Sequence, residues 1–354
     1  MQLGFVLLKG DLELAKEEVL SVLGTREYDL AGNLLLAHSE LLGSELAQRL
    51  GMTSSVHEVL FSCTVDEVEH HMNSFDWTSV YADNFSIRIE VLTYVRGQHG
   101  GPTPLTKDHR SLPWTEKTLA AYIWRAVNQP RVKLRGAKTR IQLFVFGDLA
   151  VCTRLLGLAD ARFEERRPHL RAFAYSGGMH PRLVRALINL SGARKGETIL
   201  DPCCGSGGML IEAGLCGMRA EGYDVNRKMV WGCIRNMAQL KLLDYKVTAR
   251  DVLQLEGTWD YIVTDLPYGL NSVIVGRDKQ RLSLKKESGQ HDIEHFYIAF
   301  FHKLKEILGR RAVIVHSHLI DGKALARQAG LKMEREFSQY VHGSLTRKII
   351  VLCP

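Results

Sequence analysis

The feature that most constrains the fold of this chain is a short apolar strand that runs directly into a glycine-rich turn. The segment TILDPCCGSGG covers residues 198–208, and an apolar helical pattern begins straight after it. Glycines at such a turn allow a sharp bend from strand to helix and a close approach of the backbone to a ligand. From residue 176 onward, strand-like and helix-like segments alternate. We therefore predict a doubly wound, mostly parallel α/β sheet over residues 176–354, closed by an antiparallel hairpin over residues 332–352.

Acidic residues follow three successive predicted strands in this region. Asp201 ends the first strand, Asp224 ends the second about 20 residues beyond the first glycine, and Asp251 ends the third. The carboxyl ends of the strands form the ligand-binding edge of an open α/β sheet, and an acid at this spacing usually meets ribose hydroxyls. We predict a cofactor site at this edge. Its expected residues are Asp201, Cys203, Gly205, Ser206, Gly207, Asp224, Val225, Asp251 and Val252.

Two cofactor classes fit a glycine loop of this kind. The dinucleotide pattern G-x-G-x-x-G needs a third glycine at the position of Leu210. Asp201, four residues before the first glycine, instead suits a cofactor that carries a cation, such as the amino group of S-adenosyl-L-methionine. The loop therefore favours S-adenosylmethionine over a nicotinamide cofactor. A tight turn that binds no ligand is the remaining interpretation.

A second motif, TDLPYG at residues 264–269, follows the apolar strand at residues 261–263. The exocyclic amine of guanine or adenine is a poor nucleophile, because its lone pair is delocalised into the ring. Asp265 and the backbone carbonyl of Leu266 can accept both N–H bonds of such an amine, and the carboxylate can then take a proton. Pro267 stiffens the loop, and Tyr268 offers a ring on which an extruded base can stack. No metal ion is expected, since a sulfonium already activates its methyl group.

The chain of 354 residues is longer than one hydrophobic core usually supports. We expect a small α+β domain over residues 1–60, a second domain over residues 61–156 and an arginine-rich linker over residues 157–175. Residues 1–60 carry nine acids against four bases, whereas residues 107–140 carry nine bases against two acids. This segregation favours a polyanionic partner, with a solvated basic face as the alternative.

Several segments together resemble one known family. DPCCGSGG, Asp224, Asp251 and DLPYG resemble the motifs of Rossmann-fold amino-methyltransferases. VNQPRVKLRGAKTRIQLFVFGD and RFEERRPHLRAF resemble parts of a THUMP domain and the segment that leaves it, preceded by a ferredoxin-like domain. The closing HGSLTRKIIVL is similar to the last strand of the same group. The chain thus resembles the archaeal THUMP-domain tRNA (guanosine-10 N2) methyltransferases.

The resemblance implies methylation of the N2 amine of guanosine 10 in tRNA, once or twice, with S-adenosylmethionine as cofactor. It implies that the ferredoxin-like and THUMP domains grip the tRNA, and it leaves open a small activator subunit. Phosphate contacts fix the register of a nucleic acid and carry little sequence information. The expected RNA-binding residues are Arg131, Lys133, Arg135, Lys138, Arg140, Arg166 and Arg167.

The chain departs from the family at two positions, which keeps alternatives open. Leu266 replaces a proline that is common there, and Cys203 stands where a bulkier aromatic residue is frequent. Relatives that modify guanosine 6 of tRNA can also carry leucine at the position of Leu266, but they tend to have asparagine in place of Asp265. Further alternatives are a DNA adenine N6-methyltransferase, a nicotinamide-dependent dehydrogenase and a non-catalytic RNA-binding protein.

The remaining expectations concern location and individual side chains. No apolar run approaches bilayer length and the N-terminus lacks a signal-peptide pattern, so we expect a cytoplasmic protein whose seven cysteines are free thiols. Trp114 and Trp124 are expected in the core, and Phe173 and Tyr175 are candidates for covering the cofactor. We expect the basic stretch over residues 275–290 to form a flap that contacts RNA. His342 and Arg347 are expected in a structural hairpin, with an approach to the target strand as the alternative.

Overall fold

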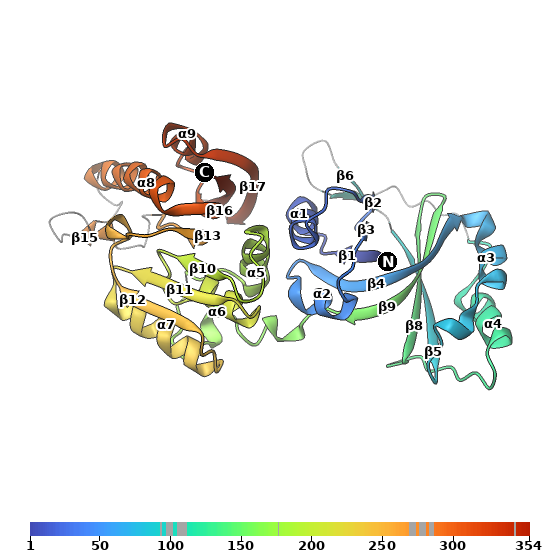
Figure 1. Cartoon of the computed structure of the whole chain (residues 1–354). Helices are drawn as coiled ribbons and strands as arrows, with labels where there is room; N and C mark the ends of the chain where they lie inside the picture. The colour runs from blue at the N-terminus through green and yellow to red at the C-terminus, as the bar shows by residue number, and fades with distance from the viewer. Residues whose placement is uncertain are drawn as a thin grey trace. The chain divides into compact units, whose positions relative to one another are not determined.

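The fold was analysed in a computed structural model of the chain. It describes residues 1–92, 94–96, 102–104, 112–175, 177–268, 274–275, 281–282, 287–342 and 345–354. The chain divides into two compact units, Met1–Asp160 and Ala161–Pro354 (Figure 1). Each unit is built on its own seven-stranded sheet. No helix in the described parts of the chain combines the length and apolarity that a bilayer crossing requires.

The sheet of the first unit is mainly antiparallel, with strand order β2-β3-β1-β4-β9-β8-β5. Its strands are β1 (Gln2–Leu7), β2 (Asp29–Ala31), β3 (Leu34–His38), β4 (Thr53–Thr64), β5 (Phe85–Val91), β8 (Thr139–Phe146) and β9 (Leu149–Leu158). A separate hairpin consists of β6 (Tyr94–Arg96) and β7 (Pro102–Pro104). The helices are α1 (Leu12–Leu23), α2 (Gly43–Arg49), α3 (Val68–Ser74) and α4 (Glu116–Ala126).

Strand β4 makes the first unit continuous, because it pairs with β1 on one side and with β9 on the other. The expected boundary between residues 60 and 61 falls inside this strand, so the two expected domains share one sheet. Helix α4 has a capped N-terminus, since the Thr115 side chain accepts a hydrogen bond from the Thr118 amide. Of the two tryptophans expected in the core, Trp114 is 3% exposed, but Trp124 is 52% exposed and that expectation is wrong.

The sheet of the second unit has strand order β12-β11-β10-β13-β16-β18-β17. Its strands are β10 (Thr198–Asp201), β11 (Arg219–Asp224), β12 (Tyr245–Ala249), β13 (Trp259–Asp265), β16 (Leu308–Ser317), β17 (Lys332–His342) and β18 (Leu345–Cys353). The five strands from β12 to β16 are parallel neighbours, and β18 and β17 close the sheet in antiparallel fashion. The doubly wound fold with a closing hairpin is thereby confirmed. A two-stranded piece, β14 (Ile274–Val275) and β15 (Arg281–Leu282), lies outside this sheet.

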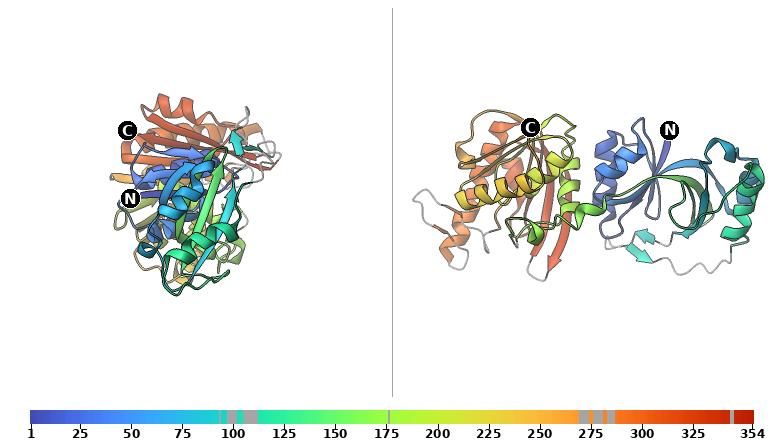
Figure 2. Two further views of the ribbon diagram at one scale, coloured as in Figure 1. Left: turned by 90° about the vertical axis from the view of Figure 1, so that its right-hand side faces the viewer. Right: turned by 90° about the horizontal axis from the view of Figure 1, so that it is seen from below.

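Helices cover both faces of the second sheet (Figures 1 and 2). They are α5 (Pro181–Leu190), α6 (Gly208–Leu215), α7 (Arg227–Gln239), α8 (Glu287–Ile307) and α9 (Gly322–Gln328). Helix α6 contacts α5 and α7, whereas α8 contacts α9. The chain runs from β10 to β11 and β12 in one direction, and from β13 to β16 in the other. Right-handed crossovers in opposite directions place their helices on opposite faces, which fits these two groups.

The arginine-rich segment after β9 belongs to the second unit rather than to a free linker. Two 3-10 turns, Ala161–Phe163 and Pro168–Leu170, lie in it. Arg166 is only 5% exposed, and its Nε donates to Glu212 of α6 over 2.7 Å. Arg185 of α5 reaches the same carboxylate over 2.8 Å. The expectation that Arg166 contacts RNA phosphate is therefore wrong, because its guanidinium is buried in an ion pair with Glu212.

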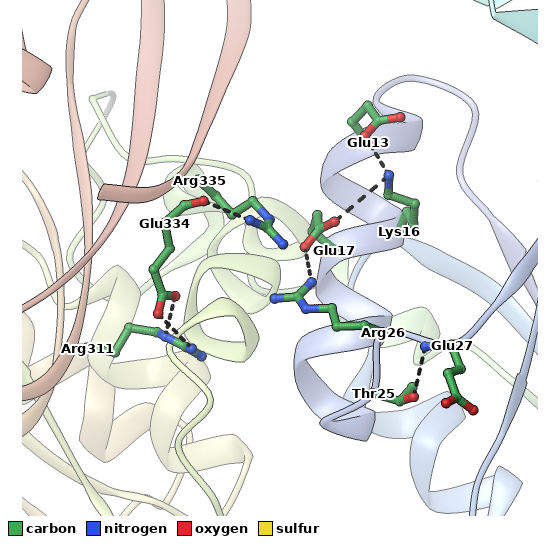
Figure 3. Close-up of polar contacts among 9 residues, drawn as sticks. All are labelled: Glu13, Lys16, Glu17, Thr25, Arg26, Glu27, Arg311, Glu334 and Arg335. Atoms are coloured by element: carbon green, nitrogen blue, oxygen red, sulfur yellow. Dashed lines mark hydrogen bonds and ion pairs between the residues drawn. The ribbon is translucent and has the colours of Figure 1, made fainter. Parts of the chain in front are cut away.

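More exposed ion pairs occur in each unit. In the first, Arg26 pairs with Glu17 of α1 over 2.7 Å, and in the second, Arg311 of β16 pairs with Glu334 of β17 over 3.0 Å (Figure 3). All seven cysteines of the chain are free thiols in this structure, as expected. Most of the expected basic flap over residues 275–290 lies outside the described residues, as does the side chain of His342.

Candidate active site

The glycine loop lies at the carboxyl end of β10, the middle strand of the parallel part of the sheet. Gly205 and Gly207 have φ angles of +50° and +89°, in the left-handed region that favours glycine. A Cβ added at Gly207 would lie 2.5 Å from the Cys233 sulfur of α7, whereas one added at Gly205 would meet no atom within 4 Å. Gly207 thus permits close packing of α7, and Gly205 borders open space where a ligand can approach the backbone.

Asp224, at the end of the neighbouring strand β11, holds the loop in place. Its Oδ2 accepts from the Gly205 amide over 2.9 Å, and its Oδ1 accepts from the Asn226 amide over 2.8 Å. Burial raises the pKa of this carboxyl, although both backbone bonds oppose the rise. Val225 beside it is 42% exposed. An acid fixed here at the β11 end is placed as the sequence predicts for a ribose contact.

Asp251 follows β12, the next strand outward. Its Oδ1 accepts from the Leu253 amide over 3.0 Å and caps the 3-10 turn Val252–Gln254. The Val252 side chain is 4% exposed and packs in the main core of the unit. Asp251 therefore stands where the sequence places it, and Val252 has only its backbone left for the expected cofactor contact.

Asp201 links the glycine loop to the next strand on the other side. Its Oδ1 accepts from the Thr264 hydroxyl of β13 over 2.7 Å and from the Cys203 amide over 3.2 Å. The residue is 2% exposed, and burial raises its pKa to about 7. A cation bound beside this carboxyl would favour its ionised form. Thr264 was missed by the sequence analysis, because nothing local indicates that a threonine on one strand bonds an acid on another.

Asn236 of α7 ties the loop to the segment that precedes α5. Its side-chain amide donates to the Ser206 carbonyl over 2.9 Å and to the Phe173 carbonyl over 3.1 Å. Its oxygen accepts from the Phe173 amide over 2.7 Å. The Phe173 ring packs against Gly232 of α7 and meets the Trp231 ring edge-on, with centroids 6.1 Å apart. Fully buried Asn236 thus ties the glycine loop to the backbone at Phe173.

These residues fit S-adenosylmethionine. Asp224 and Asp251 stand at the two strand ends where a nucleoside would lie, and the glycine loop borders open space at Gly205. Asp201 suits the amino group of the methionyl tail, because a cation bound there would favour the ionised carboxylate. When bound, the cofactor supplies an activated methyl group.

The catalytic loop after β13 is held by bonds to two neighbouring elements. The Leu266 amide donates to the Val315 carbonyl of β16 over 2.9 Å, and the Tyr297 hydroxyl of α8 donates to the Pro267 carbonyl over 3.2 Å. The Leu266 side chain is 1% exposed and packs in the core. In the described part of the chain, no donor bonds the Leu266 carbonyl. Its oxygen therefore keeps the capacity to accept a hydrogen bond.

Asp265, Tyr268 and Arg347 form a chain of hydrogen bonds. The Tyr268 hydroxyl donates to Asp265 Oδ1 over 2.5 Å, and Arg347 Nε of β18 donates to the Tyr268 oxygen over 3.2 Å. Burial raises the pKa of Asp265 to about 6, while the tyrosine bond and the arginine charge oppose the rise. Burial and the Asp265 charge keep the pKa of Tyr268 far above its usual value, so its hydroxyl stays a donor. Sequence analysis assigned Arg347 to the hairpin and missed this contact.

The expected RNA-binding residues divide between the two units. Arg131, Lys133, Arg135, Lys138 and Arg140 are all exposed in the first unit. Asp83 pairs with Arg131 and lies 4.0 Å from the Lys138 ammonium, so part of their charge is balanced. Arg167, in the second unit, is exposed and paired with Glu164 over 2.5 Å. Six of the seven cations are thus accessible to a polyanion, and buried Arg166 is not.

Comparisons with known proteins agree with this geometry. Residues 168–349 match the family model described as "RMKL-like, methyltransferase domain". The chain is 32% identical over 310 residues to the tRNA (guanine(10)-N2)-dimethyltransferase of Methanothermobacter thermautotrophicus, covering 87% of this chain and 84% of that protein. It is 26% identical over 349 residues to the enzyme of the same name from Pyrococcus abyssi, with 96% of each chain covered.

A solved structure shares the fold over the whole length. The structure of TrmN from Thermus thermophilus matches with a TM-score of 0.51 at 17% identity, covering 100% of this chain and 99% of that one. At this identity the likeness shows the α/β architecture alone. The glycine loop, the acids at the strand ends and the two sequence matches together identify the family. The chain belongs to the tRNA (guanine(10)-N2)-dimethyltransferases, and its second unit is an S-adenosylmethionine-dependent methyltransferase domain.

Proposed function

We propose that this chain methylates the exocyclic N2 amine of guanosine 10 in tRNA, giving N2-methylguanosine and then N2,N2-dimethylguanosine. One observation carries the proposal: Asp265 is half-buried at the end of β13, the strand beside the glycine loop, with the Leu266 carbonyl next to it. The names of the matched relatives supply the position in tRNA.

Two acceptors orient the amine in this proposal. The Asp265 carboxylate takes one N–H bond and the Leu266 carbonyl takes the other, which points the nitrogen lone pair at the methyl group. Alignment of the reacting atoms supplies most of the acceleration. As the nitrogen gains its substituent it becomes acidic, and Asp265 Oδ accepts the proton. The Tyr268 ring stacks on the extruded base, a contact worth roughly 1–3 kcal/mol in comparable sites.

Leucine at position 266 does not disturb this arrangement. A leucine keeps the backbone carbonyl, and its buried side chain anchors the loop in the core. The guanosine-6 alternative rests on a more limited likeness, 24% identity over 257 residues to the tRNA (guanine(6)-N2)-methyltransferase of Archaeoglobus fulgidus, covering 64% of this chain and 58% of that protein. Position 10 is therefore the better supported site.

The first unit is assigned to holding the tRNA. Its five exposed cations between residues 131 and 140 suit phosphate contacts, which set register without reading sequence. In this proposal residues 1–60 form the ferredoxin-like part and residues 61–156 the THUMP part, joined through β4. A small activator subunit stays a prediction, which activity of the purified chain alone would contradict.

The test uses unmodified tRNA transcripts and labelled S-adenosylmethionine. The wild-type transcript should gain up to two methyl groups, recovered as N2-methyl- and N2,N2-dimethylguanosine. A transcript with guanosine 10 replaced by adenosine should gain none, whereas replacement of guanosine 6 should leave labelling unchanged. The reverse pattern would establish the guanosine-6 activity instead.

A further inference from the structure

Arg347 reaches the catalytic edge of the sheet through strand register rather than through sequence proximity. Strand β18 runs antiparallel to β16, and Arg347 pairs with Ser317, the last residue of β16. Strand β16 in turn runs parallel to β13, with Val315 opposite Asp265. The arginine therefore lies at the same end of the sheet as Asp265, although 82 positions separate them in the sequence.

The Arg347 side chain is aimed at the catalytic loop. Its Nε donates to the Tyr268 hydroxyl, which donates to Asp265. The next residue, Lys348, points to the other face of the strand, as alternation requires. Its ammonium lies 2.8 Å from the Ser338 hydroxyl and 3.4 Å from the Glu336 carboxylate, both on β17. One strand thus carries a cation on each face, and only that of Arg347 contacts the catalytic loop.

We propose that Arg347 is a positioning residue for methyl transfer: through the Tyr268 hydroxyl it orients the Asp265 carboxylate and holds it ionised. The inference rests on the proposed function, because it assigns Asp265 the task of taking a proton from the target amine. In that step an N–H bond breaks, its electron pair stays on nitrogen, and an O–H bond forms on Asp265. A carboxyl that is already protonated cannot take part.

The surroundings of Asp265 otherwise oppose its ionisation. Burial is the main cause of its raised pKa. Asp201 on the neighbouring strand β10 has the higher pKa, about 7, and the Asp265 charge contributes to that rise, so Asp265 ionises first. Tyr297 of α8 stays protonated there, because burial and the Asp265 charge both raise its pKa. Tyr268 donates a hydrogen bond, and Arg347 supplies a positive charge. Removing the arginine should therefore shift the balance toward the neutral acid.

The test is the pH dependence of methyl transfer in a single turnover, with tRNA and S-adenosylmethionine both saturating. The wild-type rate should rise with pH through an acid limb near 6, the pKa to which burial raises Asp265. Arg347→Met should move that limb upward by about one unit, the lower end of the effect of a nearby opposite charge. The variant should therefore lose about ten-fold more rate below the limb than above it. Arg347→Lys, which keeps the charge, should restore most of the wild-type profile.

Lys348→Met is the matched control, since it removes a cation from the same strand on the opposite face. Its acid limb should coincide with that of the wild type. Calorimetry of S-adenosylmethionine binding verifies that each variant is folded, and all three should retain the wild-type affinity. If Arg347→Met does not fold, Tyr268→Phe removes the connecting hydroxyl and should raise the acid limb in the same direction.

Three outcomes would overturn the inference. An acid limb that stays in place in Arg347→Met, with a weaker tRNA affinity alone, would make the residue an RNA contact. An equal shift in Lys348→Met would indicate a general effect of surface charge. Arg347→Lys behaving like Arg347→Met in a folded protein would exclude the role of charge. Methyl transfer by the wild-type chain to a nucleotide other than guanosine 10 would instead refute the proposed function, so the two failures are distinguishable.

Discussion

The two units of this protein differ in the ionisable groups that their proposed roles use. In the first unit, the five cations expected to contact RNA are exposed, and buried His57 stays neutral because burial lowers its pKa to about 4. In the second unit, Asp201 is buried and Asp265 is half-buried at strand ends, with pKa values raised to about 7 and 6. Exposed charge suits a polyanion of any sequence. Acids with perturbed pKa values suit one reaction, and they mark the second sheet as the catalytic one.

Removal of the Asp265 carboxylate should have the largest effect. Asp265→Ala should lower the single-turnover rate by roughly 10²–10⁴-fold, the usual contribution of a positioned acid or base. S-adenosylmethionine affinity, measured by calorimetry, should change little. Asp224→Ala should show the opposite split, with weaker cofactor binding as its main defect. An equal loss of cofactor affinity in both variants would contradict the separate roles given to the two acids.

The buried ion pairs of the second unit should contribute more to the free energy of unfolding than exposed ion pairs do. Glu212 is 0% exposed and shared by Arg166 and Arg185. Glu212→Gln leaves buried positive charge without its partner and should lower the free energy of unfolding by about 3–5 kcal/mol. Denaturant unfolding measures this change.

Asp83 of the first unit provides the control for Glu212. It is 37% exposed and pairs with Arg131, which is 71% exposed. Asp83→Asn should cost no more than about 1 kcal/mol, because exposed ion pairs contribute little and asparagine tolerates the positive φ at this position. Equal losses of unfolding free energy for Glu212→Gln and Asp83→Asn would contradict this difference between buried and exposed ion pairs.

The two glycines of the loop with positive φ have different roles: Gly207 permits helix packing, and Gly205 borders the space for a ligand. Gly207→Ala forces a Cβ to 2.5 Å from the Cys233 sulfur and should lower stability by about 1–3 kcal/mol beyond the cost of its positive φ. Gly205→Ala meets no atom and should cost only about 1–2 kcal/mol for the left-handed backbone. Its Cβ enters the open space beside the loop. Gly205→Ala should therefore weaken S-adenosylmethionine binding by more than its small loss of stability would cause. Thermal unfolding and calorimetry on both variants give the comparison.

The smallest effects belong to the first unit. Lys133→Gln and Arg135→Gln should each weaken tRNA binding a few-fold and reduce the salt dependence by about 0.7–0.9 per phosphate contact. Both should leave the pH dependence of methyl transfer unchanged, in contrast to Arg347→Met. Filter binding over a range of salt concentrations measures the slope. Variants with an unchanged slope would show that these cations do not contact phosphate.

Local patterns predicted the elements of the active site but not the contacts between them. The glycine loop, the three acids at strand ends and the TDLPYG motif are each specified by a few consecutive residues. Arg347, Thr264 and Tyr297 reach the site from other elements, and their roles depend on strand register and helix packing that no local pattern encodes. The doubly wound fold was predictable because it repeats one strand-helix unit.

Two expectations failed for different physical reasons. An arginine in a polar segment looks the same in the sequence whether it faces water or a buried acid, so Arg166 could not be separated from Arg167 before Glu212 was found beside it. Trp124 could have been predicted. Helix α4 buries Leu119 and Ile123, four residues apart, and the residue that follows Ile123 points away from that face.

The most direct test of the central claim replaces a single group of the substrate. A tRNA with inosine in place of guanosine 10 lacks only the exocyclic amine that Asp265 and Leu266 are assigned to hold. Incubated with labelled S-adenosylmethionine, it should gain no label at position 10, while it binds the protein as tightly as the guanosine form. Methylation of the inosine transcript at the guanosine level would contradict the account, because the methyl group would then be carried by some other atom.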